Sequence, residues 1–336
     1  MNEFDHIKQL RALAQRRGSS AGLIRGIGDD AAVFRSAAGS DVVVSTDLLV
    51  EDVDFRRETT RPDLLGHKAL AVSLSDIAAM GARPLWALLA IGVPEDVWNS
   101  DYLDQFYAGF FKLADRYGVT LIGGDLSRVS SKIVIDSIVV GECPSGRELY
   151  RSGAKSGDQI FVTGYLGDAA AGLRLIERGT RLSPELDGTH LVDNLLSRQL
   201  QPEPRVGWGL LLGEKQLASA MIDISDGLSS DLTHLCDESG VGAIIEASRL
   251  PVDEVVAEIC GRRKLDPLML ALHGGEDFEL LFTVSPEKVK QLPARVDGIS
   301  ITRIGEIKTA AEGVRISEGS RVWKLEPGGW EHFRKE

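Results

Sequence analysis

The chain has few cysteines, no long apolar run and no surplus of basic residues among its 336 residues. The three cysteines, Cys143, Cys236 and Cys260, form no Cys-X-X-Cys pair, and their odd number argues against a disulfide framework. No apolar stretch reaches the roughly 20 residues that a membrane-spanning helix needs, and residues 1–17 lack the apolar centre of a signal peptide. We therefore expect a soluble, cytoplasmic protein that has no membrane partner.

Basic residues are the minority, because 38 lysines and arginines stand against 50 aspartates and glutamates, for a net charge of −12. A surface of this sign repels the phosphate backbone, so we expect no nucleic-acid partner. Hydrophobic residues make up 43% and charged residues 26% of the chain, as is usual for a globular protein. A chain of this length is expected to form two domains.

Several common signatures of enzymes are missing from the sequence. It has no Gly-X-X-X-X-Gly-Lys-Ser/Thr loop, which excludes a P-loop enzyme. The His-Arg-Asp and Asp-Phe-Gly pair of protein kinases and the Gly-X-Ser-X-Gly elbow are also absent. The six histidines form no His-Glu-X-X-His zinc motif. An ATP-using enzyme with this sequence must therefore have another architecture.

Hydrophobic periodicity predicts helices and strands in both halves of the chain. In the first half we expect helices over 4–17, 62–80 and 101–117, and strands over 41–45, 85–93, 119–122 and 132–140. In the second half we expect strands over 159–163, 221–224, 243–247 and 278–284, and helices from 167 and over 227–238. This mixture predicts the α/β or α+β class.

The segment 142–158 is rich in glycine, serine, proline and charged residues, which is typical of a join between domains. We therefore predict an N-terminal domain over 1–145 and a C-terminal domain over 146–336. The sequence shows no short-period repeat and no low-complexity tract.

Several aspartates follow apolar segments that are predicted to be strands. The alternation of a strand places Ser45 with Asp47, and Asp223 with Ser225, on common faces. The other members of this set follow glycines or lie in turns: Asp30, Asp125 and Asp226. Each also has a structural alternative, since an aspartate can cap a helix and Gly-Gly-Asp often forms only a turn. Five such sites in one chain nevertheless favour a shared ligand.

Asp76 lies within the predicted helix 62–80, where its neighbours one turn away include Val72 and Met80. This environment is apolar, and a buried carboxylate without a partner is costly, so it shifts its pKa or binds a cation. The alternative is that Asp76 caps a second helix that begins near Ile77. Carboxylates together with hydroxyl oxygens suit Mg²⁺, Mn²⁺ or Ca²⁺ better than zinc.

Glycine turns can supply the phosphate-binding part of such a site. Residues 163–168 (TGYLGD) join a predicted strand to a predicted helix, and main-chain N–H groups at such a helix start can bind phosphate. Arg151 could meet a nucleotide phosphate, although each feature is weak evidence alone. Together with the acids, they predict an ATP-using phosphotransferase that depends on magnesium.

Eight segments resemble those of the thiamine-monophosphate kinase family, within the superfamily typified by aminoimidazole ribonucleotide synthetase. They are GIGDDAAV (26–33), STDLLVEDVDF (45–55), SLSDIAAMGARP (73–84), LIGGD (121–125), YRSGAKSGD (150–158), VTGYLGDAAAGL (162–173), DISDGLSSDL (223–232) and GGEDFELLF (274–282). They occur in the family order and cover essentially the whole chain.

The resemblance implies a two-domain α/β (α+β) fold, in which the N-terminal domains of two subunits pair into a β-barrel-like core of a homodimer. It also implies a kinase that phosphorylates thiamine monophosphate to thiamine diphosphate with ATP and several Mg²⁺ ions. The phosphoryl transfer would be direct and in-line, and it is the last step of thiamine diphosphate biosynthesis.

The resemblance also assigns expected roles to individual residues. The magnesium positions are Asp30, Ser45, Thr46, Asp47, Asp76, Asp125, Asp223 and Asp226. The ATP contacts are Tyr107, Gly124, Asp125, Arg151 and Ser225, and the substrate contacts are Asp54, Glu276 and Trp330. No acid–base residue is expected, because the acceptor phosphate, with a second pKa near 6, is already mostly dianionic at about pH 7.

Other readings of the sequence remain open. Within the superfamily they are a selenophosphate synthetase, a hydrogenase-maturation factor and a purine-pathway synthetase. The first usually has a reactive cysteine near its N-terminus and the second a functional cysteine at its end, whereas the first cysteine here is Cys143 and none lies near Glu336. A protein that binds divalent ions without catalysis and a metal-dependent phosphatase are alternatives of other classes.

Overall fold

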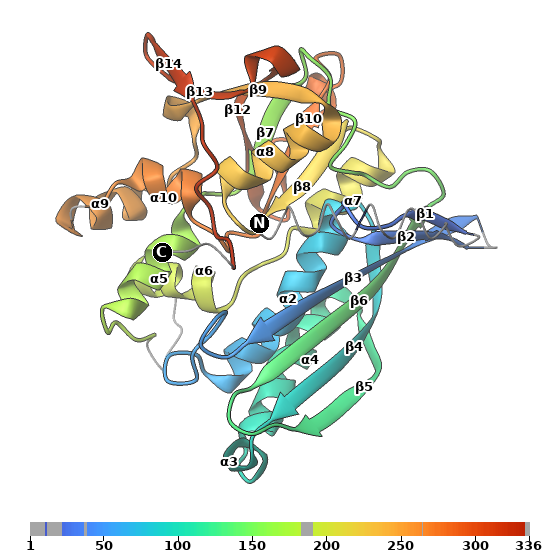
Figure 1. Ribbon diagram of the computed structural model, residues 1–336, viewed down its shortest axis with the longest axis vertical. Coiled ribbons are helices and arrows are strands. Elements are labelled where there is room, and N and C mark those ends of the chain that lie inside the picture. The colour runs from blue at the N-terminus through green and yellow to red at the C-terminus, as the bar shows by residue number, and fades with distance from the viewer. Residues whose placement is uncertain (1–10, 12–21, 37–38, 183–190, 264, 333–336) are drawn as a thin grey trace.

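The computed structural model describes residues 11, 22–36, 39–182, 191–263 and 265–332. Two β-sheets and the helices around them form the molecule, so the expected mixed α/β class is confirmed (Figure 1). The helix expected over 4–17 lies outside the described residues, apart from Arg11. Among the described helices, none is long and apolar enough to cross a membrane.

The first sheet contains six strands in the order β1-β2-β3-β6-β4-β5. These strands are β1 (Leu23–Arg25), β2 (Ala32–Arg35), β3 (Ser40–Val50), β4 (Arg83–Val93), β5 (Thr120–Arg128) and β6 (Val134–Pro144). Neighbouring strands are antiparallel except β4 and β5, which are parallel. Helices α2 (Pro62–Ala79) and α4 (Tyr102–Tyr117) cover one face, and the short α3 (Glu95–Trp98) follows β4 (Figure 1).

The two faces of this sheet differ in burial. Alternate residues of β3 and β6, such as Val43 and Val139, are fully buried under the helices. The residues between them point outward, and no described helix or strand covers that face (Figure 1). Some outward residues of the sheet are nevertheless apolar, since Leu48 of β3 is 58% and Trp86 of β4 is 44% exposed.

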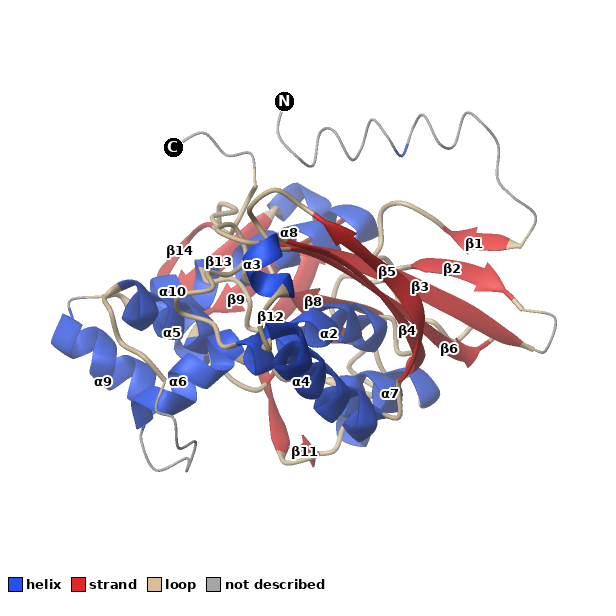
Figure 2. Ribbon diagram, turned by 90° about the horizontal axis from the view of Figure 1, so that it is seen from below, coloured by secondary structure: helices blue, strands red, loops and turns tan. Residues whose placement is uncertain are grey.

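The second sheet contains eight strands, with seven in the order β14-β13-β9-β12-β7-β10-β8 and β11 paired with β12. Its strands are β7 (Gln159–Thr163), β8 (Ala220–Ile224), β9 (Val241–Glu246), β10 (Glu279–Val284), β11 (Arg295–Val296), β12 (Ile299–Thr309), β13 (Val314–Glu318) and β14 (Arg321–Lys324). The α-helices of this half are α5 (Asp168–Glu177), α6 (Leu191–Leu200), α7 (Val206–Glu214), α8 (Leu228–Ser239), α9 (Glu254–Arg263) and α10 (Pro267–His273). Helix α8 packs on one face, while residues of the other face share a core with α2 and α7 (Figure 2).

Helix α2 lies at the centre of the molecule. All of its 18 residues except Pro62, Asp63 and Asp76 are buried, as expected for a helix that is apolar on every side. It contacts α4, α7, the first sheet and strand β8. One continuous hydrophobic core therefore extends from the first sheet across α2 to residues of the second, such as Phe282.

Two glycines allow α2 and α4 to approach each other closely. A Cβ atom at Gly66 would lie 1.9 Å from the main-chain oxygen of Phe106, and one at Gly109 would lie 1.7 Å from that of Asp63. Any larger residue at either position would have to push the two helices apart. This contact thus fixes the position of α2 over the sheet.

The structure confirms most expected elements and lengthens several strands, among them β6, which is expected to end at residue 140 but continues to Pro144. The strand expected over 41–45 continues to Val50, so Asp47 lies inside β3. The strand expected to stop before residues 123–125 instead passes through them, because Gly124 and Asp125 pair with Leu89 and Ala90 of β4. Tertiary pairing therefore outweighs the weak strand propensity of Gly-Gly-Asp. The domain division at residue 145 stays a prediction, with 145–158 containing no helix or strand.

The helix contact leads to a stability prediction. Gly109→Ala should lower the free energy of unfolding by about 2 kcal/mol or more, because the new methyl group overlaps the main chain of α2. Gly261→Ala in α9 is the matched control, since nothing lies within 4 Å of the added Cβ there. Urea unfolding measures both variants, and equal effects would contradict the proposed role of the contact.

Candidate active site

Three aspartates from distant parts of the sequence meet beside α2. Asp30 precedes β2, Asp76 lies on α2 and Asp223 lies in β8. One carboxylate oxygen of each falls within 4.8 Å of the others, a spacing that could hold a metal ion. The structure thus brings together three of the eight expected magnesium positions, from both halves of the chain.

Hydroxyl groups orient these carboxylates. Ser45 Oγ donates hydrogen bonds to Asp76 Oδ2 and, at 3.3 Å, to the main-chain oxygen of Asp30. Ser75 Oγ donates to Asp223 Oδ2 at 2.7 Å. Helix α2 is continuous through Asp76, whose main-chain oxygen accepts the N–H of Met80 at 3.0 Å. The alternative that Asp76 caps a second helix is therefore wrong.

The carboxylates destabilise one another's charged forms. Burial, followed by the charges of Asp47, Asp223 and Asp30, raises the pKa of Asp76 well above its ordinary value. Burial and the charge of Asp30 raise the pKa of Asp223 to about 8. Burial also raises the pKa of Asp47 to about 6, with Asp136 and Asp30 adding to the effect. The cluster thus holds more negative charge than its surroundings neutralise.

The donor atoms fit a hard divalent cation. Asp30 Oδ2 and Asp47 Oδ2 are buried and have no hydrogen-bond partner among the described residues. Such orphaned oxygens are costly unless a cation or water satisfies them. Carboxylate and hydroxyl oxygens, without a histidine or cysteine among them, are the ligands that Mg²⁺ prefers. Asp30, Asp47, Asp76 and Asp223, with Ser45, are therefore the residues that could hold it.

Arg151 lies at the edge of this cluster. Its Nη2 donates to Asp30 Oδ1 at 2.5 Å, and its main-chain N–H donates to Asp29 Oδ1 at 3.2 Å. Its Nε is buried without a hydrogen-bond partner among the described residues. Arg25 forms a further ion pair with Asp29 at 2.8 Å. Arg151 is thus placed where the sequence predicts a nucleotide phosphate contact, next to the acids.

Thr46 and Asp125 lie on the outer face of the first sheet instead. Thr46 Oγ1 donates to Asp136 Oδ1 at 2.5 Å, and Asp125 accepts a hydrogen bond from Ser127 Oγ at 3.1 Å. In the strand register, Asp136 and Asp125 both lie beside Ala90, so they share one row of the sheet. Neither side chain joins the three-carboxylate cluster within this chain.

Two of the expected ATP contacts have visible structural roles. Gly124 has a φ of 153°, and a Cβ there would lie 1.9 Å from the main-chain oxygen of Leu89, so β4 and β5 need glycine at this position. Tyr107 lies on α4, where its ring stacks on that of Phe111 at 6.1 Å. The described contacts of Tyr107 place it in the helix layer and not at the cluster.

The three expected substrate residues lie in one region, in which Asp54 and Glu276 both contact Lys68 of α2. Asp54 Oδ2 accepts the N–H of Val50 at 2.7 Å. Burial raises the pKa of Asp54, and among the nearby charges Glu276 raises it further while His332 lowers it. The ring of His332 lies 5.8 Å from that of Trp330, edge to face. Asp54, Glu276 and Trp330 therefore share one neighbourhood.

A short turn connects this neighbourhood to the aspartate cluster. The main-chain oxygen of Ser225 accepts the N–H of Glu276 at 2.7 Å, and that of Asp226 accepts the N–H of Trp330 at 3.0 Å. Ser225 and Asp226 directly follow β8, which carries Asp223. The aspartate cluster and the neighbourhood of Glu276 and Trp330 are thus both connected to the end of β8.

The main chain and the side chain of Trp330 have different surroundings. Its N–H anchors the C-terminal segment, while its indole is 54% exposed. A cavity of about 840 Å³ lies beside it, between α10 and β14. Trp330 is the one expected substrate residue that lines this cavity.

Several side chains at the site were not predicted from the sequence. Lys68 on α2 forms an ion pair with Glu276 Oε1 at 2.6 Å, and Gln199 Nε2 donates to Glu276 Oε2. Asp231 is buried beside Asp226 and Asp223, and burial raises its pKa well above the ordinary value. A lysine within an apolar helix is a signal of a buried partner, so Lys68 could have been identified in the way Asp76 was.

Two further acids of the GGEDFELLF segment have structural partners. Asp277 accepts the N–H groups of Gly167 and Ala169 at 2.7 and 3.2 Å and so caps the start of α5. Glu279 forms a two-bonded ion pair with buried Arg205, at 2.6 Å for Nε to Oε2. The first acid of the segment, Glu276, is therefore the one that faces the candidate site.

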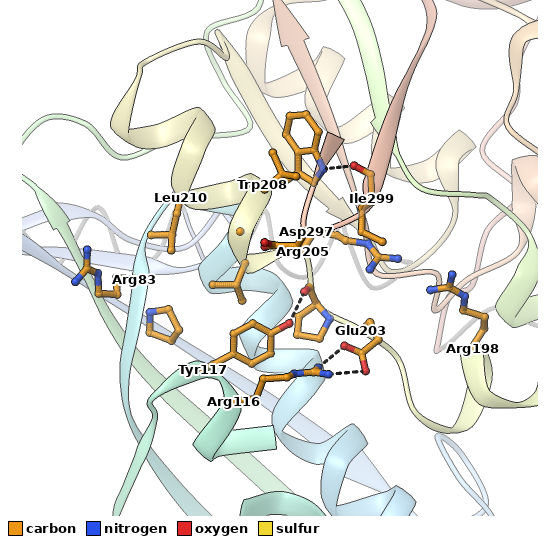
Figure 3. A pocket seen from close by; sticks show the side chains of 15 residues that line it. Arg83, Arg116, Tyr117, Arg198, Glu203, Arg205, Trp208, Leu210, Asp297 and Ile299 are labelled. Atoms are coloured by element: carbon orange, nitrogen blue, oxygen red, sulfur yellow. Dashed lines mark hydrogen bonds and ion pairs between the residues drawn. The ribbon is translucent and has the colours of Figure 1, made fainter. Parts of the chain in front are cut away.

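A second cavity, of about 650 Å³, lies where α4, α7 and the β11–β12 hairpin meet (Figure 3). Arg116 and Glu203 lie side by side in its wall, where Arg116 donates two hydrogen bonds to the carboxylate of Glu203 (Figure 3). Arg205, which also lines it, is bound to Glu279. Arg116 and Arg205 are therefore already paired with acids, and none of the expected site residues lines this cavity.

Fold and site together define an AIR-synthase-related protein. The chain matches the family models "AIR synthase related protein, N-terminal domain" over residues 28–143 and "AIR synthase related protein, C-terminal domain" over residues 155–317. Thiamine-monophosphate kinase of Buchnera aphidicola subsp. Schizaphis graminum is 36% identical over 335 residues, which cover 99% of each chain. The chain belongs to the thiamine-monophosphate kinase family.

Solved structures agree with this family. The structure of AaThiL complexed with AMPPCP and TMP matches with a TM-score of 0.84 at 33% identity, over 99% of this chain and 97% of the other. Thiamine-monophosphate kinase from Stenotrophomonas maltophilia K279a matches with a TM-score of 0.76 at 40% identity, over 94% and 96%.

The acidic cluster leads to a prediction about pH and cations. Asp47 and Asp223 have raised pKa values of about 6 and about 8, so the folded chain binds more protons than the unfolded chain between about pH 4 and pH 8. Without a cation, their contribution to the free energy of unfolding should therefore fall as the pH rises through this window. Added Mg²⁺ should raise the melting temperature strongly at about pH 8 and weakly at about pH 5, because protons compete for its ligands.

Asp76→Asn should remove most of this Mg²⁺-induced shift. Asp41→Asn is the matched control, because Asp41 is also buried but its carboxylate accepts hydrogen bonds from Ser145 Oγ and the N–H of Gly146. Thermal unfolding with and without Mg²⁺ measures both variants. An unchanged shift in Asp76→Asn would show that the cation binds elsewhere.

Proposed function

We propose that the chain transfers the γ-phosphoryl group of ATP to the phosphate of thiamine monophosphate, forming thiamine diphosphate and ADP, with magnesium as the cofactor. The juxtaposition of the Asp30–Asp76–Asp223 cluster with the Asp54, Glu276 and Trp330 neighbourhood supports this proposal most directly. The relatives named above carry this activity in their names, and AaThiL binds AMPPCP, an ATP analogue, together with TMP.

Magnesium ions held by Asp30, Asp47, Asp76 and Asp223 would neutralise the phosphate groups of both substrates. Arg151 would turn from Asp30 toward the nucleotide phosphates, since its guanidinium can form bidentate bonds with phosphate. Asp125, Asp226, Ser225, Thr46, Gly124 and Tyr107 remain proposed metal or nucleotide contacts on the strength of the resemblance.

The acceptor site would recognise the two parts of thiamine by different means. The carboxylates of Asp54 and Glu276 suit the positive thiazolium ring, and the exposed indole of Trp330 can stack on an aromatic ring. The attacking oxygen is that of a phosphate, which is ionised near neutral pH, so the reaction needs no general base. Catalysis would then depend on the alignment of the two phosphates and on electrostatics.

A homodimer belongs to the same proposal. Val44, Val140 and Trp86 are neighbours across three strands on the outer face of the first sheet, where they form part of an apolar surface. An uncovered apolar face of this kind is typical of a subunit interface. Pairing of two such faces would form the barrel-like core and would place the partner subunit beside Thr46 and Asp125.

The proposed location is the cytoplasm. The three cysteines are free and buried in the structure, as in proteins of reducing compartments.

The test of the function is ADP release by the purified protein with MgATP, with and without thiamine monophosphate. We expect ADP and thiamine diphosphate to form together and only with the acceptor. Asp76→Asn and Asp47→Asn should each lower kcat by about 100-fold or more, because both remove a charged ligand of the metal. Asp41→Asn should keep most of the activity, and circular dichroism checks that all three variants are folded.

Other outcomes of this assay would reject the proposal. ADP without thiamine diphosphate would indicate a related synthetase or an ATPase. No ADP formation at all would favour a protein that binds divalent ions without catalysis. Normal turnover in both aspartate variants would refute the metal assignment.

The dimer leads to a separate prediction. Val140→Lys should convert a dimer of twice 36.4 kDa into a monomer, because the lysine would place a charge in the apolar interface. Met269→Lys on α10 is the control, since Met269 is 50% exposed on another surface. Light scattering after size-exclusion chromatography gives the masses, and an unaltered dimer in Val140→Lys would place the interface elsewhere.

A further inference from the structure

Lys68 is a buried charged residue that the chemistry above does not use. It lies on α2, and its side chain is only 3% exposed, which is rare for lysine. Its ammonium group pairs with Glu276 Oε1 at 2.6 Å and donates to the main-chain oxygen of Asp54 at 3.4 Å. Lys68 therefore contacts both acids that are proposed to bind the acceptor.

Glu276 is held from several sides. Lys68 binds one carboxylate oxygen, Gln199 Nε2 binds the other, and the main-chain N–H donates to the oxygen of Ser225. Its φ of 66° lies in the left-handed region, which residues other than glycine seldom adopt. Such a conformation persists only where the surroundings hold it, and it is common at binding sites. The position of this carboxylate is thus fixed before any ligand binds.

The charge balance of this neighbourhood also depends on Lys68. Asp54 and Glu276 repel each other, as the raised pKa of Asp54, caused first by burial and also by Glu276, indicates. With Lys68 the three groups carry a net charge of −1, whereas the two ionised acids alone would carry −2. A single negative charge complements the single positive charge of a thiazolium ring.

Helix α2 sets the spacing between the two ends of the site. Ser75, seven residues after Lys68, returns to the same side of the helix at roughly 10 Å along its axis. Ser75 Oγ donates to Asp223 Oδ2 of the aspartate cluster. Lys68 and Ser75 therefore connect one rigid helix to the acceptor acids and to the cation ligands.

We infer that Lys68 is a positioning residue of the acceptor site, which fixes Glu276 and the Asp54 turn so that their carboxylates bind the cationic ring of the acceptor. This inference rests on the proposed function. Because its ammonium is buried and bound to Glu276, Lys68 acts through Glu276 and does not itself touch the substrate. The loss of Lys68 should therefore weaken the binding of the acceptor without affecting the binding of the nucleotide.

The experiment compares steady-state kinetics of Lys68→Met, Lys68→Arg, Glu276→Gln and the Lys68→Met/Glu276→Gln double variant. Lys68→Met should raise the KM for thiamine monophosphate by about tenfold or more, with the KM for MgATP changed less than about twofold. Lys68→Arg, which keeps the charge, should restore most of the affinity. In the Glu276→Gln variant, the additional change Lys68→Met should raise the KM for thiamine monophosphate by less than about threefold, because the two residues act as a unit.

Lys288→Met is the matched control, since Lys288 Nζ is also partly buried but donates to the main-chain oxygen of Gln216 at 2.5 Å. An unchanged KM for the acceptor in folded Lys68→Met would overturn the inference. A rise of about tenfold in the same KM when Lys68→Met is added to Glu276→Gln would also overturn it. If Lys68→Met fails to fold, Gln199→Leu removes the opposite support of Glu276 and should raise the same KM. An unaltered KM in Gln199→Leu would then overturn the inference.

The proposed function and the role of Lys68 can be refuted separately. A wild-type protein that forms no thiamine diphosphate refutes the proposed function and the inference with it. An active wild type whose variants bind the acceptor normally refutes the role of Lys68 alone.

Discussion

The burial of helix α2 on every side is the constraint on which both sheets and the site depend. The helix fills the space between the two sheets, so each buried polar residue on it must find its partner inside the protein. Lys68 pairs with Glu276, Ser75 donates to Asp223, and Asp76 accepts from Ser45. The same helix that joins the two sheets therefore also gathers the functional groups.

Folding concentrates negative charge in this centre, and the apolar core offsets the cost. Asp30, Asp76 and Asp223 would lie far apart in the unfolded chain, whereas the folded chain holds their oxygens within 4.8 Å. Arg151 neutralises only part of this charge. The cluster by itself would repel a nucleotide, so phosphate binding there needs cations between the acids and the phosphates. The affinity of the proposed site for ATP should thus be coupled to that for magnesium.

The sequence predicts the elements that depend on local periodicity and misses those that depend on pairing. The apolar neighbours of Asp76 at helical spacing correctly indicate a carboxylate on α2 whose pKa is shifted, since it is raised well above its ordinary value. The passage of β5 through Gly124 depends on its parallel pairing with β4, which no local pattern encodes. Strand alternation also implies that Thr46 points away from Ser45 and Asp47, as the structure shows. The convergence of Asp30 with Asp223 is a tertiary contact, which the sequence indicates only through the number of such aspartates and through the family resemblance.

Two independent links fix the distance between the cation ligands and the acceptor acids. One is α2, through Ser75 and Lys68, and the other is the turn after β8, whose carbonyl oxygens accept the N–H groups of Glu276 and Trp330. Both links reach Asp223, the helix through the carboxylate that Ser75 binds and the turn through the main chain that follows β8. In-line transfer between two phosphates depends on their alignment far more than on an acid or base. A rigid frame of this kind is therefore what a phosphotransferase without a general base requires.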